Sequence, residues 1–455
     1  MCFPLKPTLS SPSEMSSSSR EALESIMRAG LEAVHSGNAV SRWVRRLPNG
    51  SLRVGDRILP PRAGLWVAAM GKAAPHMAAA VEAVSGDHLR GGLVVSPEGH
   101  FQGISLSLES REAGHPFPDQ RSERAARDLL KIVQGIPDED ILLVLLSGGA
   151  SALTACPAVG LTLVQLEEAT RMLLASGADI GEVNSVRKHC SSFSGGRLAV
   201  ASATRKIEVL AISDVPGDRV DVIGSGPCSA DETTFSDARE VLDRFGLTER
   251  IASPLRDYLE AGVQGKRPES HQADAPGLQG VHYRVIASNQ DARSAACQMG
   301  QRLGLRTVDL GEIMQGEARV MGARLAALSQ GVRWAKPILL VAGGETVVRV
   351  TGDGRGGRNQ ELALSAALEW DRMKRVRKAA ILSVGTDGRD GQSEATGAFA
   401  DEKTVRHGLE LGLEASKALE RNDSYGFFSR VGGSLPAGPT GTNVMDLALL
   451  WVDEK

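Results

Sequence analysis

The stretch Leu65-Trp66-Val67-Ala68-Ala69-Met70-Gly71-Lys72-Ala73-Ala74 passes from a continuous apolar run through one glycine into a helical pattern. A continuous apolar run is typical of a parallel strand buried on both faces, and a strand, a glycine turn and a helix make a βα unit. Further apolar runs alternate with helical patterns at 73–84, 122–133 and 163–174. The apolar runs themselves lie at 92–95, 141–146 and 208–212. The alternation predicts an α/β fold with a parallel sheet.

The segment 264–280 interrupts this alternation. It is polar, contains Pro268 and Pro276, and is typical of a linker between domains. Beyond it, a second α/β domain is predicted from apolar runs at 283–287, 337–342, 346–350, 380–384 and 444–452. Residues 1–19 are rich in Ser and Pro, lack the apolar region of a signal peptide, and are expected to form a disordered tail. The expected organisation is a tail at 1–19, a first domain at 20–263, a linker at 264–280 and a second domain at 281–455.

Composition excludes several classes of function. The 455 residues carry a net charge of −3 and only 4% aromatic residues, so no nucleic-acid surface is expected. Five cysteines form no C-x-x-C pair and nine histidines form no H-E-x-x-H, which argues against zinc and favours a reducing compartment, the cytoplasm. The uncharged stretch 141–164 has the length of a membrane span, but its glycines and proline favour a buried strand followed by a loop.

A glycine-rich loop precedes a helical pattern in the second domain, at Thr351-Gly352-Asp353-Gly354-Arg355-Gly356-Gly357-Arg358-Asn359-Gln360-Glu361. Its glycines at 352, 354 and 357 satisfy G-x-G-x-x-G, the pattern that binds a dinucleotide pyrophosphate. Two arginines flank the glycines, and the preceding predicted strand contains Arg349, which a strand buried on both faces would not carry. The first acidic residue after the next predicted strand, Asp387, also comes too late for a ribose ligand. We therefore expect the loop to bind a terminal phosphate or a carboxylate; a solvent-facing turn is the alternative.

Polar residues also follow the predicted strands of the first domain. Lys72 falls in the first turn of a helix, where a cation is unfavourable unless it faces an anion. Ser147-Gly148-Gly149-Ala150-Ser151 can form a nest of backbone N–H donors, although a packing turn is equally compatible. The loop 224–227 can supply further donors, and 184–189 is either a solvated face or a phosphate-contacting element. His115, which precedes Pro116 and Pro118 in a rigid loop, is expected to be structural.

Carboxylates occupy two more loops. Asp214 follows a predicted strand, where it can hold Mg²⁺ or accept a hydroxyl proton, and an Asx turn is the rival interpretation. Asp387, with Asp390 and Glu394 beyond it, either gathers around a metal or forms Asx turns. Loops that combine glycines, cations and carboxylates suit phosphoryl transfer, because that reaction depends on positioning and charge neutralisation.

The motifs, taken in order along the chain, resemble those of a known family. They are Gly71-Lys72-Ala73, His115-Pro116-x-Pro118, Ser147-Gly148-Gly149-x-Ser151-Ala152-Leu153, Asn184-x-x-Arg187-Lys188-His189, Ser213-Asp214-Val215-x-Gly217-Asp218, Asp221-Val222-Ile223-Gly224-Ser225-Gly226-Pro227, Gly343-Gly344-Glu345-Thr346, Gly354-x-Gly356-Gly357-Arg358-Asn359-Gln360-Glu361 and Gly385-Thr386-Asp387-Gly388-x-Asp390-Gly391. From about residue 20 onward the chain resembles the class II glycerate kinases, or glycerate 2-kinases, whose C-terminal half is called the MOFRL domain. The resemblance implies an N-terminal Rossmann-like parallel-sheet domain, a C-terminal MOFRL-type α/β domain and an active site in the cleft between them. It also implies that D-glycerate and ATP are converted to 2-phosphoglycerate and ADP with Mg²⁺.

The resemblance assigns roles to particular residues. Lys72, Asp214 and Arg358 match the catalytic positions. Lys72 and Arg358 would hold the glycerate carboxylate or the moving phosphoryl group, and Asp214 would act as base or metal ligand. Asp387 is the second expected metal ligand. The expected substrate- and phosphate-binding residues are Ser147, Gly148, Gly149, Ser151, Asn184, Arg187, Lys188, Gly224, Ser225, Gly226, Arg355 and Asn359.

One position departs from the family pattern, since Ser194 stands where we expect many relatives to carry a lysine. If that lysine contacts phosphate, the protein must do without it or supply another cation, with Lys188 and Arg197 as the candidates. Two other functions stay open at this stage: an NAD(P)H-dependent hydroxypyruvate reductase and a non-catalytic sensor of a sugar acid phosphate. A homodimer is a further expectation.

Overall fold

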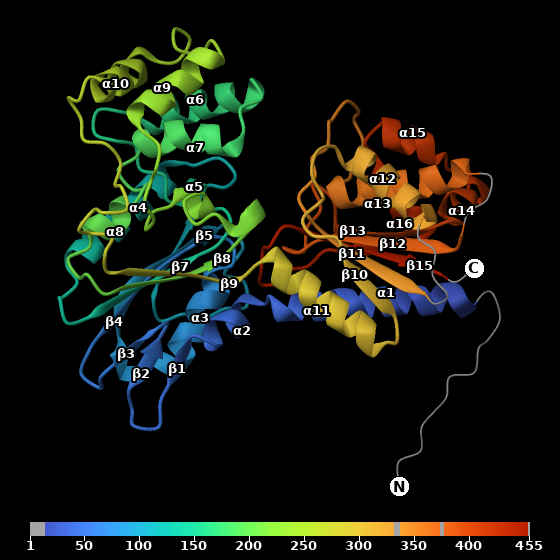
Figure 1. The fold of residues 1–455 in the computed structure, drawn as a ribbon, viewed down its shortest axis with the longest axis horizontal. Coiled ribbons are helices and arrows are strands. Elements are labelled where there is room, and N and C mark those ends of the chain that lie inside the picture. Colours follow the sequence, from blue (N-terminus) through green and yellow to red (C-terminus); the bar gives the residue numbers. More distant parts are fainter. Residues whose placement is uncertain (1–13, 332–336, 374–376, 454–455) are drawn as a thin grey trace. The chain divides into compact units, whose positions relative to one another are not determined.

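The computed structural model describes residues 14–331, 337–373 and 377–453, which form two compact units (Figure 1). The parallel-sheet unit comprises His35–Ser288 and Gly441–Asn443. The mixed-sheet unit comprises the described residues up to Val34, Asn289–Thr440 and the described residues from Val444 onward. Each unit has its own six-stranded sheet and its own hydrophobic core, so the predicted pair of α/β domains is confirmed.

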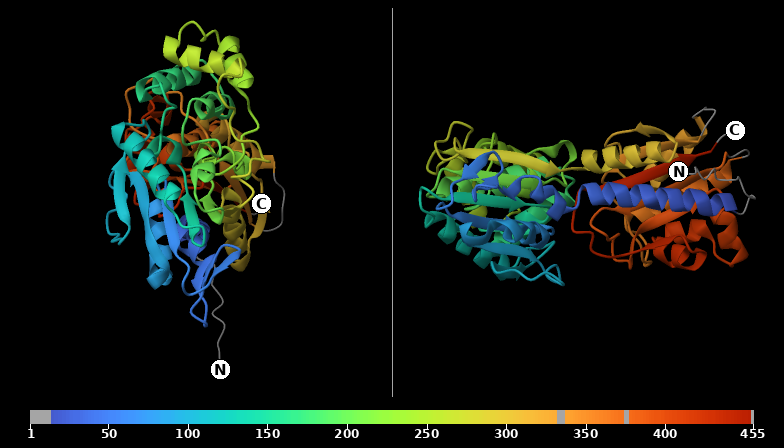
Figure 2. Two further views of the ribbon diagram at one scale, coloured as in Figure 1. Left: turned by 90° about the vertical axis from the view of Figure 1, so that its left-hand side faces the viewer. Right: turned by 90° about the horizontal axis from the view of Figure 1, so that it is seen from below.

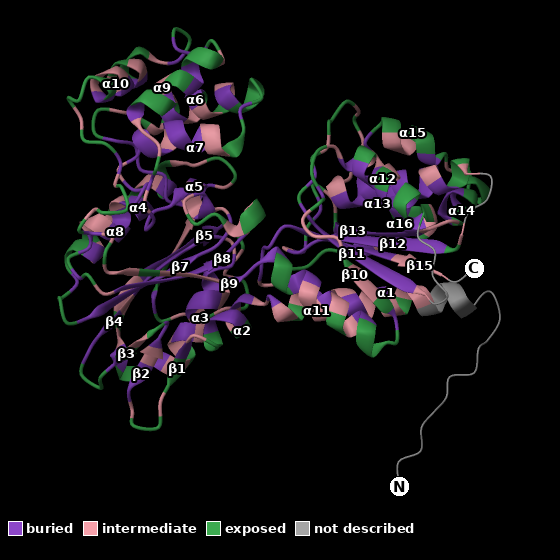
Figure 3. Ribbon diagram, viewed as in Figure 1, coloured by how far each residue is buried: buried purple, intermediate pink, exposed green. Residues whose placement is uncertain are grey.

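The parallel-sheet unit is built on six parallel strands in the order β6-β5-β4-β7-β8-β9. The strands are β4 (Leu65–Met70), β5 (Leu89–Pro97), β6 (Glu109–Ala113), β7 (Ile141–Leu146), β8 (Ile207–Ile212) and β9 (Val281–Ala287). β7 and β8 are buried along their whole length, as their apolar runs predict (Figure 3). Met70 pairs with Leu146, and Leu146 pairs with Ala211, so β4, β7 and β8 end at one edge of the sheet. The segments that follow these three strands therefore start side by side.

Several helices of this unit begin where the sequence supplies a side-chain cap. The carboxylates of Asp119 and Asp179 and the hydroxyls of Thr162 and Thr234 accept backbone N–H bonds from the first helical turn. The helices are α2 (Ser36–Ser41), α3 (Ala74–Ser85), α4 (Gln120–Gln134), α5 (Ala150–Leu153), α6 (Leu163–Ala175), α7 (Ile180–His189), α8 (Arg197–Ala201), α9 (Phe235–Arg244) and α10 (Ser253–Val263), with short 3-10 turns η1 (Gly86–His88), η2 (Pro216–Asp218) and η3 (Ile223–Ser225). A small antiparallel sheet adds β1 (Val44–Arg46), β2 (Leu52–Val54) and β3 (Arg57–Leu59).

The mixed-sheet unit has the strand order β10-β11-β15-β12-β13-β14. β10 and β11 are parallel, and every other neighbouring pair in this sheet is antiparallel. The strands are β10 (Arg306–Asp309), β11 (Ile338–Gly344), β12 (Ala379–Gly385), β13 (Ala395–Asp401), β14 (Ser434–Pro436) and β15 (Asp446–Val452). The helices are α1 (Glu14–Ala33), α11 (Asn289–Arg302), α12 (Ala318–Gly331), α13 (Arg358–Arg372), α14 (Thr404–Glu410), α15 (Ala415–Glu420) and α16 (Ser424–Val431).

Helices cover both faces of this second sheet. Leu340 of β11 belongs to the core that contains the buried side chains of α12 and α13, whereas Leu339 belongs to the core formed with α1 and α11. α1 and α11 lie side by side along that second face (Figure 1), and the right-hand view of Figure 2 shows them from below. The alternation follows from the period of two in a strand, which sends neighbouring side chains to opposite faces. None of the described helices is both long and apolar enough to cross a membrane.

The units divide the chain differently from the predicted domains. The predicted linker 264–280 does not separate them, because β9 pairs with β8 and completes the parallel sheet before the chain leaves this unit after Ser288. At the other end, α1 joins the mixed-sheet unit, where Leu23 and Ile26 are buried. Both differences come from packing between segments far apart in the sequence. Of the predicted tail, residues 1–13 lie outside the described residues, and α1 begins at Glu14.

The strand predicted at 346–350 is not present. β11 ends at Gly344, and within 346–350 only Val347 forms an isolated bridge, with Glu317. Val347 and Val350 are 59% and 74% exposed, and only Thr346 and Val348 of this stretch turn toward the core. The glycine-rich loop therefore starts from an irregular segment rather than directly from a strand.

Candidate active site

The three loops at the common edge of the parallel sheet are bonded to one another. After β4, the backbone N–H of Lys72 donates to the carbonyl oxygen of Gly148 at 2.9 Å, and the N–H of Ala73 donates to Ser147 Oγ at 3.0 Å. Gly148 and Ser147 follow β7, the next strand of the sheet. These bonds hold the start of α3 against the β7 loop, which places the Lys72 backbone at the predicted nest.

Two glycines make this close approach feasible. Gly71 has φ +128°, and a Cβ on it would lie 2.5 Å from the carbonyl oxygen of Ser147. Gly149 has φ +89°, and a Cβ there would lie 2.9 Å from the ring of His115 and 3.6 Å from Lys72 Cγ. The Lys72 and His115 side chains therefore pass next to Gly149. His115, which we expected to be only structural, lies beside the candidate site.

Asp214, which follows β8, lies against the same loop. A Cβ on Gly148 would overlap Asp214 Oδ2 and would lie 2.5 Å from Asn443 Nδ2. The amide of Asn443 donates to Asp214 Oδ2 at 3.3 Å. The structure thus gathers Lys72, the 147–149 loop and Asp214 at adjacent strand ends, where α/β sheets bind their ligands. Asn443 was not among the predicted site residues, because it lies 229 residues from Asp214 in the sequence.

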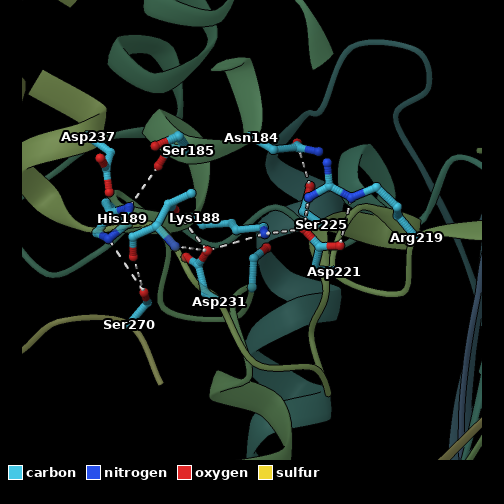
Figure 4. Close-up of polar contacts among 12 residues, drawn as sticks. Asn184, Ser185, Lys188, His189, Arg219, Asp221, Ser225, Asp231, Asp237 and Ser270 are labelled. Atoms are coloured by element: carbon cyan, nitrogen blue, oxygen red, sulfur yellow. Dashed lines mark hydrogen bonds and ion pairs between the residues drawn. The ribbon is translucent and has the colours of Figure 1, made fainter. Parts of the chain in front are cut away.

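Three predicted phosphate-binding side chains form a connected group. The hydroxyls of Ser151 and Ser225 lie 2.8 Å apart. Ser225 Oγ donates to Asn184 Oδ1 at 3.1 Å (Figure 4). Gly224 and Gly226, on either side of Ser225, have φ values of +60° and +59°. The loop 224–227 is therefore a tight turn that holds Ser225 against α5 and α7.

Lys188, another predicted phosphate ligand, is already paired with carboxylates. Its Nζ lies 3.4 Å from Asp231 Oδ1 and 3.6 Å from Asp221 Oδ2, and Lys188 and Asp231 are 2% and 0% exposed (Figure 4). Burial alone would raise the pKa of Asp221, but Arg219 and Lys188 hold that pKa below its usual value. This arrangement favours a structural ion-pair network, so the phosphate-binding role of Lys188 stays a prediction without support in the contacts.

The two arginines near this network differ in their contacts. Arg197 donates to the carbonyl oxygens of Lys188 and Ser194 at 2.9 and 3.0 Å, which makes it a brace of the loop in which Ser194 replaces the expected lysine. The side chain of Arg187 has no hydrogen bond or ion pair with any residue that the structure describes, and burial lowers its pKa. Arg187 is one turn after Asn184 on α7. A partly buried guanidinium without a carboxylate partner is suited to bind an anionic ligand.

In the mixed-sheet unit, Arg358 is bound by two carboxylates. Its Nε and Nη2 lie 2.5 and 2.9 Å from the two oxygens of Asp446, and Nη2 lies 2.9 Å from Glu345 Oε1. Asp446 is completely buried, and burial raises its pKa to about 7 against the opposing effect of Arg358. Arg358 therefore neutralises a buried carboxylate, whatever further role it has. Nothing in the sequence pattern pointed to Asp446.

The N-terminus of α13 is occupied by the protein itself. Asp390 Oδ1 accepts the backbone N–H of Asn359 at 3.0 Å, and Asp390 Oδ2 accepts the N–H of Gln360 at 2.9 Å. Gly357, the N-cap, has no room for a Cβ because Asp390 lies against it. The carboxylate of Asp390 thus fills the place that a dinucleotide or a phosphate would take at a helix N-terminus.

The backbone donors of the glycine-rich loop are also used internally. The N–H groups of Thr351 and Gly352 donate to Asn422 Oδ1 at 2.8 and 2.9 Å, and that of Arg355 donates to Asp423 Oδ1 at 3.0 Å. The expected anion-binding loop is therefore largely a packing turn against residues 421–424. The Arg355 side chain stays half exposed, 3.5 Å from Glu394.

The second predicted metal ligand forms a local turn. Asp387 Oδ1 accepts the backbone N–H of Arg389 at 3.1 Å, as in an Asx turn. Asp390 caps α13, and Glu394 is 79% exposed. Within the described ranges no three His, Cys, Asp or Glu residues are grouped so that they could hold a metal ion. A carboxylate cluster of Asp387, Asp390 and Glu394 is therefore absent there, and the local-turn interpretation of Asp387 is supported.

Comparison with known proteins matches both halves of the chain. A family model described as a domain of unknown function, DUF4147, matches residues 22–260, and the MOFRL family model matches residues 338–446. A glycerate 2-kinase of Pyrococcus horikoshii is 38% identical over 397 residues, which cover 86% of this chain and 88% of that protein. A D-glycerate 2-kinase of Thermotoga maritima is 37% identical over 429 residues, which cover 93% of this chain and 96% of that protein.

A solved structure agrees with these relatives. The crystal structure of a glycerate kinase from Thermotoga maritima matches with a TM-score of 0.82 and 34% identity, covering 96% of this chain and 100% of that one. With both family models, the full-length relatives and the fold in agreement, the chain belongs to the class II glycerate kinase family with a C-terminal MOFRL domain.

Proposed function

We propose that this protein is a glycerate 2-kinase, which transfers the terminal phosphoryl group of ATP to the 2-hydroxyl of D-glycerate and releases ADP. The observation that carries the proposal is the meeting of Lys72, the 147–149 loop and Asp214 at one edge of the parallel sheet. A cation, backbone donors and a carboxylate at adjacent strand ends are the groups that phosphoryl transfer requires. Relatives named glycerate 2-kinase, aligned over most of the chain, supply the substrate.

Three residues of the parallel-sheet unit have different proposed roles in the reaction. Lys72 stabilises negative charge on the phosphoryl group or on the glycerate carboxylate. Asp214 accepts the proton of the attacking hydroxyl or holds the metal ion of the nucleotide. Arg187, which has no carboxylate partner among the described residues, binds a phosphate or the carboxylate of glycerate.

Magnesium fits the donor set at Asp214. Mg²⁺ in kinases is usually held by one or two carboxylates together with substrate phosphates rather than by a cage of protein ligands. Asp214 offers such a carboxylate at a strand end, with the amide of Asn443 beside it. When bound, the ion neutralises charge on the phosphates. Asp387, bonded in its Asx turn, has no such support as a second ligand.

The reductase alternative loses its main physical argument. The G-x-G-x-x-G pattern suggested a dinucleotide, but Asp390 fills the N-terminus of α13 and Asn422 takes the N–H groups of Thr351 and Gly352. A loop whose backbone N–H donors are already bonded has none left to bind a pyrophosphate.

We also propose a cytoplasmic location. The described cysteines are free thiols, as expected in a reducing compartment, and burial raises the pKa of the Cys190 thiol to about 12.

The decisive experiment measures ADP release with D-glycerate, L-glycerate and hydroxypyruvate in parallel, with the phosphorylated position read by phosphorus NMR. The proposal expects turnover with D-glycerate, the phosphate at the 2-position, and loss of turnover in folded Lys72→Ala and Asp214→Asn. Binding of D-glycerate without ADP release would support the sensor instead. NAD(P)H oxidation that depends on hydroxypyruvate, without kinase activity, would establish the reductase. Light scattering of the same preparation tests the expected homodimer.

A further inference from the structure

The segment Gly441–Asn443 belongs to the parallel-sheet unit, although the residues on both sides of it belong to the mixed-sheet unit. It is anchored at its first residue: the carbonyl oxygen of Gly441 accepts the backbone N–H of Ser36 at 3.2 Å. Gly441 has φ +72°, and a Cβ on it would lie 2.8 Å from Nε2 of His35. The turn therefore sits against α2 in a conformation that favours glycine.

The last residue of this segment reaches the candidate active site. Asn443 is 9% exposed, and its Nδ2 donates to Asp214 Oδ2 at 3.3 Å. Both side chains press on Gly148, where a Cβ would overlap Asp214 Oδ2 and lie 2.5 Å from Asn443 Nδ2. The Asp214 carboxylate is thus held between a glycine of the β7 loop and an amide supplied from 229 residues away.

The residue after Asn443 is held just as closely. The backbone N–H of Val444 donates to Thr386 Oγ1 at 2.8 Å, and the carbonyl oxygen of Met445 accepts from the same hydroxyl at 2.6 Å. The backbone beside Asn443 is thus fixed, and the burial of the Asn443 side chain leaves it little room for another rotamer. Its amide can therefore impose one orientation on the carboxylate that it contacts.

We propose that Asn443 is a positioning residue for Asp214: its amide donates to one carboxylate oxygen and thereby orients the other toward the reacting group. The proposal rests on the glycerate 2-kinase function given above. A carboxylate that acts as base or as ligand of the nucleotide's metal ion must be held in a productive orientation, because misplacement by about 1 Å can lower a rate about a hundredfold. Asn443 acts through Asp214 and needs no contact of its own with substrate.

Two substitutions separate hydrogen bonding from packing. Asn443→Leu nearly keeps the shape of the side chain but removes the donor without adding a charge beside Asp214, whereas Asn443→Ala removes the donor and the volume together. If donation matters, Asn443→Leu lowers kcat about as much as Asn443→Ala, and both lose about tenfold or more. If only packing matters, the leucine variant retains more activity than the alanine variant. Asn49→Ala, an exposed turn asparagine of the same unit that bonds Ser51 N–H, is the matched control and leaves kcat unchanged.

The experiment measures ADP release by the wild type, the two variants and the control, each shown to be folded by its melting temperature. We expect the loss in kcat, with KM for ATP and for D-glycerate changed by less than about twofold, because a positioning residue affects the reacting state more than binding. In an Asp214→Asn background the Asn443→Ala substitution costs nothing further, because its effect passes through Asp214. If Asp214→Asn has no measurable rate, the test rests on the relative kcat values of the single Asn443 variants.

The outcomes for the two proposals are distinguishable. Wild-type turnover together with full activity in Asn443→Leu overturns the positioning role and leaves the kinase function standing. Higher activity in Asn443→Leu than in Asn443→Ala also overturns it, in favour of packing. A wild type that releases no ADP with D-glycerate removes the proposed function and the positioning role with it.

Discussion

Asp390 offers the most direct test of how the glycine-rich loop is organised. Its carboxylate accepts the backbone N–H groups of Asn359 and Gln360 at 3.0 and 2.9 Å and the Gln360 side-chain amide at 3.0 Å. Asp390→Ala leaves these buried donors without an acceptor. A buried donor without a partner costs about 1–3 kcal/mol. Part of this loss is offset, because the variant no longer buries a charged carboxylate; the cost of burying that charge is also what raises the pKa of Asp390. We therefore expect the free energy of unfolding to fall by about 3 kcal/mol.

The assay is urea denaturation followed by circular dichroism and tryptophan fluorescence, with the transitions of the two units fitted separately. Asp390→Asn should lose only about 1 kcal/mol, because the amide oxygen still accepts one of the N–H bonds. Glu394→Ala, in the same loop and 79% exposed, is the control and should change stability by less than about 0.5 kcal/mol. If Asp390→Ala is as stable as the Glu394 control, the carboxylate does not hold the helix, and the loop is again a candidate for an external anion.

Four further substitutions test the contacts. Lys188→Met leaves Asp231 buried without its cation and should lower the free energy of unfolding by about 3–5 kcal/mol; a loss below about 1 kcal/mol in the same urea assay would contradict the ion-pair network. Gly71→Ala places a side chain at a φ of +128° against the β7 loop, so the melting temperature and kcat should both fall. An unchanged kcat would show that catalysis does not need the close approach of residue 71 to the β7 loop. Asp446 has a folded pKa of about 7, above its unfolded value, so its contribution to stability is full at acidic pH and declines as pH rises toward 7. The stability advantage of the wild type over Asp446→Asn, measured by urea titration from pH 5 to 8, should therefore shrink with rising pH, and a constant difference would contradict the raised pKa. Arg358→Ala should be less stable than the wild type at pH 8, where it leaves the ionised Asp446 buried without its partner.

The fold class and the strand-end residues of the first unit could be predicted from local patterns. The apolar runs before Lys72 and Ser147 are buried parallel strands, and the glycines after them form the predicted tight turns. Such patterns are readable because a strand buried on both faces needs an apolar run and a close turn needs glycine. Strand ends of a parallel sheet then meet at one edge without further information.

The domain limits and the second sheet could be predicted less well from the sequence. The last run of the first sheet, β9, follows a polar segment that resembles a linker, and only its pairing with β8 assigns it to the parallel sheet. The apolar alternation at 346–350 suggested a strand, yet no neighbouring strand pairs with it over its length. Strand formation depends on a partner, and a partner distant in sequence leaves no local signal.

What the sequence determined by itself is the chemistry available: a lysine after the first core strand, a glycine nest after the next, a carboxylate after the third and a G-x-G-x-x-G loop before a helix. What only the tertiary structure decided is the partner of each group. Asn443 donates to Asp214 across 229 residues, Arg358 binds Asp446 across 88, and Asp390 caps α13 from 31 residues away. The physical reason is that an anion-binding pattern specifies donors but not the anion. Whether that anion is a ligand or the protein's own carboxylate depends on which distant side chain the packed chain brings within hydrogen-bond distance.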